Sequence, residues 1–237
     1  MKPDEIKAYQ DFARQRLGFE FKDINLLITA LTHRSYVNEH RKERLEHNER
    51  LEYLGDAVLE LVVSDYLFKN FNEPEGTMTS WRSALVRTET IGAAGEELGY
   101  GPLVRLSHGE QNGTDRAHAT IMADCFEAVV GATYLDQGYA AARQLIQQCI
   151  LDHADQILSD DSWRDPKSRL QEITQQIDGN TPVYRTIKDE GPDHNKTFTV
   201  AVYIDNKVMG TGVGHSKQEA QANAALEAIK KYQAAQA

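Results

Sequence analysis

Apolar side chains recur every three or four positions over most of the first 158 residues, and this spacing predicts helices. The predicted helical segments are residues 6–17, 24–31, 51–71, 79–86, 88–98, 117–135 and 139–158. No alternating strand pattern occurs between them, and the turn-forming residues at 99–102 and 107–115 predict loops. The sequence therefore predicts an all-α first domain, residues 1–158.

The pattern changes after a short polar connector at residues 159–164. Helical spacing over 167–177 is followed by β-rich segments at 183–188, 197–204 and 208–214, and then by an alanine-rich helix at 216–232. This α-β-β-β-α order predicts an α+β second domain, residues 165–237.

Three acids, at the start of the helix predicted at residues 51–71 or just before it, share one helical face. Glu49, Glu52 and Asp56 fall within roughly 60° of one another on a helix, so their charges repel. Gly55 costs about 1 kcal/mol relative to alanine inside a helix and usually marks a close approach by another segment. Taken alone, the stripe fits either a solvated helix face or a functional site.

A second acidic pair favours the functional interpretation. Asp124 and Glu127 are the only charges in the apolar run 121–132, again three positions apart. Two such pairs facing each other would offer hard oxygen ligands suited to Mg²⁺ or Mn²⁺. The alternative is a pair of acids at a helix edge, neutralised by arginines such as Arg87 or Arg143.

Four short runs of sequence, two of which contain the acidic residues, add to this pattern. Residues 32–39 read THRSYVNE, 49–59 read ERLEYLGDAVL, 75–86 read EGTMTSWRSALV and 123–128 read ADCFEA. In this order they resemble the bacterial ribonuclease III family, endonucleases that cut double-stranded RNA. The chain departs from the family at Tyr53, where phenylalanine is usual.

The resemblance implies a site, a cofactor and an assembly. The acids that match the family's catalytic metal ligands are Glu52, Asp56, Asp124 and Glu127. They imply binding of Mg²⁺, for which Mn²⁺ substitutes, and hydrolysis that leaves 5′-phosphate and 3′-hydroxyl ends, with no small-molecule cofactor. Glu49 and Glu75 match auxiliary acids of the cleavage site. Tyr53 matches an aromatic residue that enters the partner subunit of a symmetric homodimer.

The second domain resembles double-stranded RNA-binding domains. The runs that carry this resemblance are LQE at 170–172, GPDHNKTF at 191–198 and GVGHSKQEA at 212–220. Such domains recognise the A-form shape of RNA through phosphates and 2′-hydroxyls. The residues expected to contact RNA are Gln171, Glu172, His194, Ser216 and Lys217. Gln218 stands where a second basic residue is common, which predicts weak binding by this domain alone.

Charge at first argues against a nucleic-acid partner, because 26 Lys and Arg face 36 Asp and Glu. The excess lies in residues 1–164, with 17 basic and 27 acidic residues, whereas residues 165–237 carry 9 of each. Divalent ions bound at an acidic site invert the local potential, so this distribution is compatible with a metal-dependent nuclease.

The remaining features predict a soluble, cytoplasmic protein with no membrane partner. No apolar run approaches the length of a membrane span, and the N-terminus lacks the apolar core of a signal peptide. Cys125 and Cys149 have no metal-binding spacing and are expected to be ordinary buried thiols. The family implies ribosomal RNA precursors and structured messenger RNAs as substrates.

Two other functions agree less well with the sequence than a nuclease does. A non-catalytic RNA-binding protein with this fold would be expected to lack at least one of the four acids, and all four are present. A di-iron carboxylate site normally uses Glu-x-x-His ligand pairs, and neither His47 nor His118 has that spacing from the acids. The nuclease hypothesis therefore agrees best with the sequence.

Overall fold

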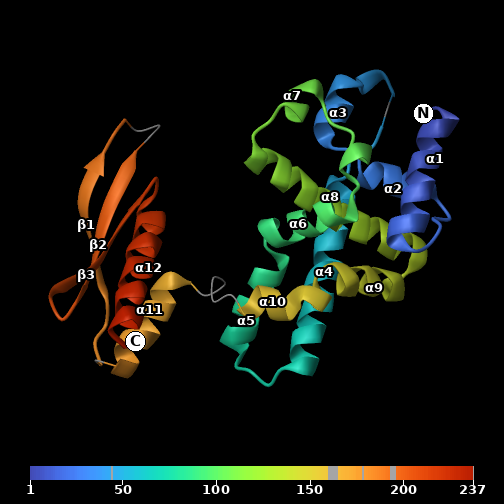
Figure 1. Ribbon diagram of the computed structural model, residues 1–237. Coiled ribbons are helices and arrows are strands. Elements are labelled where there is room, and N and C mark those ends of the chain that lie inside the picture. The colour runs from blue at the N-terminus through green and yellow to red at the C-terminus, as the bar shows by residue number, and fades with distance from the viewer. Residues whose placement is uncertain (44, 160–164, 178, 193–195, 237) are drawn as a thin grey trace. The chain divides into compact units, whose positions relative to one another are not determined.

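The computed structural model describes residues 1–43, 45–159, 165–177, 179–192 and 196–236. The chain divides into two compact units, Met1–Asp160 and Asp161–Ala237, each with its own hydrophobic core (Figure 1). The expected connector at 159–164 lies, apart from Ser159, outside the described residues. No helix in the described part of the chain combines the length and the apolar character needed to cross a membrane.

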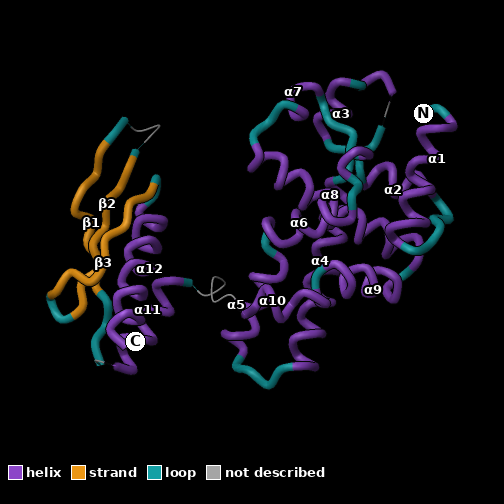
Figure 2. The backbone as a smooth tube through the Cα atoms, viewed as in Figure 1, coloured by secondary structure: helices purple, strands orange, loops and turns teal. Residues whose placement is uncertain are grey.

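The first unit is helical, as predicted. Its α-helices are α1 (Pro3–Phe12), α2 (Ile24–Ala30), α3 (Arg34–Glu39), α4 (Glu49–Asn70), α5 (Glu75–Val86), α6 (Thr88–Leu98), α7 (His108–Gln111), α8 (Asp115–Gln137), α9 (Tyr139–Cys149) and α10 (Ala154–Ser159). A π-helical turn, Ala13–Leu17, continues α1. Figure 2 shows the strands confined to the second unit, and the described residues of the first contain only an isolated bridge between Thr32 and Arg105.

Helices α4 and α8 are the longest of the first unit, with 22 and 23 residues, and they pack closely against each other. The two backbones come close together at Gly55 of α4 and Gly131 of α8, where neither helix carries a Cβ atom. A Cβ atom on Gly55 would lie 1.7 Å from the carbonyl oxygen of Glu127, and one on Gly131 would lie 2.2 Å from that of Leu51. The close approach predicted at Gly55 is therefore confirmed, and the approaching segment is the acidic part of α8.

Three details of the first unit differ from the predictions. Helix α3 was not predicted, because six residues are too few to show a period; the His33 side chain caps it by accepting the Ser35 N–H. The loop predicted at 107–115 contains the one-turn α7, which Ser107 caps through the Glu110 N–H. The helix predicted at 139–158 breaks at Ile150, whose backbone leaves the helical region while its side chain stays fully buried.

The second unit has the predicted α-β-β-β-α order. It consists of α11 (Pro166–Ile177), β1 (Val183–Glu190), β2 (Thr197–Ile204), β3 (Lys207–Gly214) and α12 (Lys217–Gln236). The antiparallel sheet has the order β1-β2-β3, and both helices cover one face of it (Figure 1). Small residues bring α12 close to the sheet, since a Cβ atom on Gly212 would lie 2.2 Å from the Ala224 nitrogen.

The helix crossing yields a stability prediction. Gly55→Ala should lower the free energy of unfolding by about 1–3 kcal/mol or more, because the added methyl group overlaps a backbone carbonyl that cannot move independently. Gly76→Ala in α5 is the matched control, since a Cβ atom there meets nothing within 4 Å. It should be neutral or stabilise by up to about 1 kcal/mol. Urea unfolding measures both; equal stability of the two variants would contradict the crossing.

Candidate active site

Asn48 fixes the start of the acidic helix α4 against the rest of the first unit. Its backbone N–H donates to the Thr32 carbonyl at 2.9 Å, and its buried side-chain amide lies 3.7 Å from the Cys125 sulfur on α8. Cys125 is buried, as predicted, whereas Cys149 is half-buried. The first turn of α4, which contains Glu49 and Glu52, is thus held in place from two sides.

The acids of α8 occupy half-exposed positions in an otherwise buried stretch of helix. Asp124 and Glu127 alternate with fully buried neighbours such as Phe126 and Ala128. The carbonyl of Glu127 is the atom that Gly55 approaches, so this residue lies directly at the crossing with α4. The arrangement places acids of both helices at one location.

The pKa values show that these carboxyl groups act on one another. Burial, and after it the negative charges of Asp56, Glu52 and Asp124, together raise the pKa of Glu127 to about 8. Burial is the largest cause that raises the pKa of Glu52, and the negative charges of Asp124 and Glu49 raise it as well. The structure therefore brings Glu49, Glu52, Asp56, Asp124 and Glu127 together. We call these five residues the acidic cluster.

The acidic cluster fits a divalent cation by its donor chemistry. All its side-chain donors are carboxylate oxygens, which hard cations such as Mg²⁺ and Mn²⁺ prefer. Their mutual repulsion is the kind that a bound cation relieves. Among the described residues, no three His, Cys, Asp or Glu side chains are placed to hold a metal ion as they stand. Coordination would therefore require the carboxyl groups to turn toward a common point.

The alternative in which Arg87 or Arg143 neutralises these acids does not agree with the contacts. The Arg87 side chain donates to the Thr90 hydroxyl at 3.3 Å, and neither Arg87 nor Arg143 is among the charges that shift the pKa values of Asp124 and Glu127. The principal charges that act on Glu127 are all negative. Its carboxyl group is thus both partly desolvated and uncompensated by a cation of the described chain.

The two auxiliary acids have different positions. Glu49 lies between two basic groups, 3.4 Å from an Arg34 nitrogen and 3.7 Å from His47 Nδ1. Glu75 begins α5 and lines a separate hollow of about 460 Å³ with Phe68 and Arg82. It is not among the charges that act on Glu52, Asp124 or Glu127. The structure therefore brings Glu49, but not Glu75 of the same chain, to the acidic cluster.

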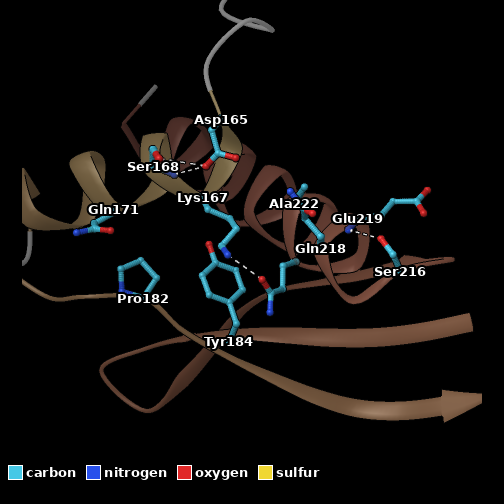
Figure 3. A pocket seen from close by; sticks show the side chains of 11 residues that line it. Asp165, Lys167, Ser168, Gln171, Pro182, Tyr184, Ser216, Gln218, Glu219 and Ala222 are labelled. Atoms are coloured by element: carbon cyan, nitrogen blue, oxygen red, sulfur yellow. Dashed lines mark hydrogen bonds between the residues drawn. The ribbon is translucent and has the colours of Figure 1, made fainter. Parts of the chain in front are cut away.

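The second unit contains a polar cavity of about 770 Å³ between α11, β1 and the start of α12 (Figure 3). Gln171 and Ser216, both expected to contact RNA, line it. Inside it, Lys167 Nζ donates to the Gln221 side chain at 2.7 Å and lies 5.3 Å from the centroid of the Tyr184 ring. No sequence pattern predicts a role for Lys167, because this contact forms only in the folded unit.

The start of α12 is capped by side chains. Ser216 Oγ accepts the Glu219 N–H at 3.1 Å, and the Glu219 carboxylate accepts the His215 N–H at 2.7 Å. The Lys217 ammonium lies 5.8 Å from the centroid of the Phe198 ring. Glu172 is exposed on α11, and His194 lies outside the described residues.

The chain matches two family models. The model described as Ribonuclease-III-like matches residues 23–154, and the Double-stranded RNA binding motif matches residues 166–232. Among curated relatives, the ribonuclease 3 proteins of Desulforamulus reducens and Oceanobacillus iheyensis are 42% and 45% identical. These alignments cover 92% and 91% of this chain, and 89% and 94% of the relatives.

A solved structure resembles the first unit. It is the nuclease domain of ribonuclease III from Campylobacter jejuni, described with a region involved in dimer formation. The match has 38% identity and a TM-score of 0.54, and it covers 60% of this chain and 96% of that one.

The raised pKa of Glu127 predicts a pH-dependent stability. Its pKa is about 8 in the folded protein and about 4.5 when unperturbed, so between these values the folded state holds a proton that the unfolded state releases. Stability of the protein in chelator should therefore fall as pH rises from 4.5 to 8, by no more than about a few kcal/mol from this group. Glu127→Gln removes the effect.

Urea unfolding in chelator at several pH values tests this. The stability of Glu127→Gln relative to the parent should increase between pH 5 and pH 8.5, because only the parent must ionise the buried group. Glu97→Gln, an exposed acid on α6, is the control and should follow the parent. Parallel pH profiles for the parent and Glu127→Gln would show that the Glu127 carboxyl group is not destabilised by its surroundings.

Proposed function

The chain belongs to the ribonuclease III family of endoribonucleases that act on double-stranded RNA, and we propose that the acidic cluster at the crossing of α4 and α8 is its catalytic site. The observation that carries the proposal is a group of acids from two rigid helices whose charges destabilise one another. Such an arrangement is costly in a protein without a cation and is typical of functional sites.

Glu52, Asp56, Asp124 and Glu127 are the residues that would hold Mg²⁺, or Mn²⁺ in its place. Bound there, a divalent ion supplies a water nucleophile of lowered pKa and stabilises charge on the phosphate and on the leaving 3′-oxygen. The residues of the chain position these carboxyl groups: α4 and α8 fix them on a rigid scaffold, and the partial burial of Glu52, Asp124 and Glu127 limits competing water. The products are ends with a 5′-phosphate and a 3′-hydroxyl.

Each of the two units has its own role in the proposed function. Residues 1–158 form the catalytic domain and residues 165–237 form the RNA-binding domain. In the second, the exposed face of α11 at Gln171 and Glu172 and the start of α12 at Ser216 and Lys217 contact phosphates and 2′-hydroxyls. His194 is assigned to the same surface by resemblance alone. The substrates are duplex regions of ribosomal RNA precursors and structured messenger RNAs.

A homodimer completes the proposal, because one acidic cluster cuts one strand and a duplex has two. Tyr53 projects from α4 with 82% of its surface exposed, although it is a large aromatic residue. Its neighbours Arg50 and Leu54 line a cavity of about 610 Å³. Two copies related by a two-fold axis would each place Tyr53 in the cavity of the other. In such a dimer, Glu75 would act across the interface.

Substitution of Tyr53 tests the dimer. Tyr53→Ala should weaken self-association by about tenfold or more, because a buried aromatic anchor typically contributes about 2 kcal/mol or more to an interface. Tyr53→Phe should retain the dimer, since the ring is kept. Tyr139→Ala, which removes a half-exposed tyrosine from α9, is the control. Sedimentation velocity at micromolar concentration measures the result, and an unchanged association constant for Tyr53→Ala would exclude this interface.

Cleavage assays test the catalytic proposal. The parent should cut a labelled RNA duplex in Mg²⁺, and neither single-stranded RNA nor a DNA duplex. Glu127→Gln should reduce the rate more than about 100-fold, since even partners of metal ligands often account for 10- to 100-fold. Glu97→Gln should cut at the parent's rate. Cutting by Glu127→Gln at the parent's rate, with normal folding, would remove Glu127 from the site.

A further inference from the structure

The segment that carries Arg34 is fixed to both acidic helices. Thr32, two residues before it, accepts the Asn48 N–H at the start of α4, and the Asn48 side chain lies against Cys125 of α8. On the other side, the His33 N–H donates to the Arg105 carbonyl at 3.1 Å. The backbone of Arg34 is therefore held at a defined distance from the acidic cluster, although it belongs to the separate helix α3.

The Arg34 guanidinium is charged, exposed and only weakly engaged. Its side chain is 67% exposed, and within the described residues its one polar contact is with Glu49, at 3.4 Å. A guanidinium has five N–H donors, and a contact of this length is a poor hydrogen bond. Most of its capacity to bind an anion is thus available.

Arg34 also acts on acids of both helices. Its positive charge opposes the rise in pKa of Glu52 on α4 and of Asp124 on α8. It is the only lysine or arginine among the principal charges that act on Glu52, Asp124 and Glu127, judged over the described chain. A cation thus stands at the edge of a site whose other ionisable groups, the histidines His33 and His47 apart, are acids.

We propose that Arg34 is a positioning residue that binds a phosphate of the RNA strand next to the scissile bond. The phosphate backbone of the RNA must approach a strongly acidic surface. The Arg34 guanidinium at the edge of this surface is planar and permanently charged, and it offers bidentate hydrogen bonds to the phosphate oxygens. When RNA binds, its phosphate would replace Glu49 as the partner of the guanidinium. This inference rests on the proposed function and adds to it a binding residue outside the acidic cluster.

A simpler role must be separated from this one. Arg34 could serve only to neutralise Glu49, in which case its loss would weaken RNA binding indirectly by exposing a negative charge. The two roles differ in salt dependence, because each phosphate contact by a cationic side chain contributes about one unit to the slope of log Kd against log salt concentration. They also differ in the double variant Arg34→Ala/Glu49→Gln, in which no unpaired Glu49 charge remains.

The test measures binding of a short RNA duplex by fluorescence anisotropy over a series of KCl concentrations. The buffer contains Ca²⁺ in place of Mg²⁺, and a gel confirms that the duplex is uncut. The proteins are the full-length parent, Arg34→Ala, Arg34→Lys, Arg34→Ala/Glu49→Gln and the control Arg14→Ala. Arg14 is also an exposed, ion-paired arginine, 2.8 Å from Glu20 on the surface of the first unit. Thermal unfolding checks that each variant is folded.

Arg34→Ala should weaken binding roughly tenfold, as the loss of a charged hydrogen bond implies, and should lower the salt slope by about one unit. The double variant should keep the reduced slope. Arg34→Lys should retain the slope but bind less tightly than the parent, because lysine keeps the charge without the fork. Arg14→Ala should match the parent.

If Arg34→Ala kept the parent's salt slope and affinity, or if the double variant recovered them, Arg34 would not contact a phosphate. Its role would then be only to neutralise Glu49. Cleavage by the parent separates this result from failure of the proposed function. A parent that cuts RNA duplex while Arg34→Ala binds normally refutes only the role of Arg34. A parent that cuts no RNA duplex refutes the catalytic proposal itself.

Discussion

The close crossing of α4 and α8 is the constraint on which the rest of the first unit depends. At Gly55 and Gly131 each helix lies against the backbone of the other, so neither can move away without losing the packing of the core. The acids beside these glycines are therefore held together although their charges repel. The free energy that keeps them there comes from the apolar faces of the two helices, which are buried on the opposite side.

This constraint explains how an acidic protein can act on a polyanion. The repulsion within the acidic cluster makes a cation favourable there, and a cation in turn makes phosphate favourable. Arg34 places a permanent positive charge at the edge of the site, and in the proposed mode of binding the RNA-binding domain adds contacts that require no net positive charge, including the capped start of α12. Binding in this account depends on a few placed groups rather than on an overall basic surface.

Much of this was predictable from the sequence, because the long helices and the order of the second unit follow from periodicity. Gly55 signalled the crossing, but the sequence did not show that Glu127 forms the other side of it. Helix α3 was too short to predict, and so the position of Arg34 beside Glu49 was hidden as well. That contact joins residues 15 apart through a loop, and it depends on the tertiary hydrogen bond between Asn48 and Thr32. Spacing within one helix carries no information about such contacts.

We propose that the acids at this crossing hold the catalytic cation. Anomalous X-ray scattering from crystals grown with Mn²⁺ tests this assignment, because the scattering locates the ion independently of activity. We expect an anomalous peak between α4 and α8, bounded by carboxylate oxygens of Glu52, Asp56, Asp124 and Glu127. If the protein cuts RNA duplex while Mn²⁺ binds elsewhere, with no peak at the crossing, these acids do not hold the catalytic cation.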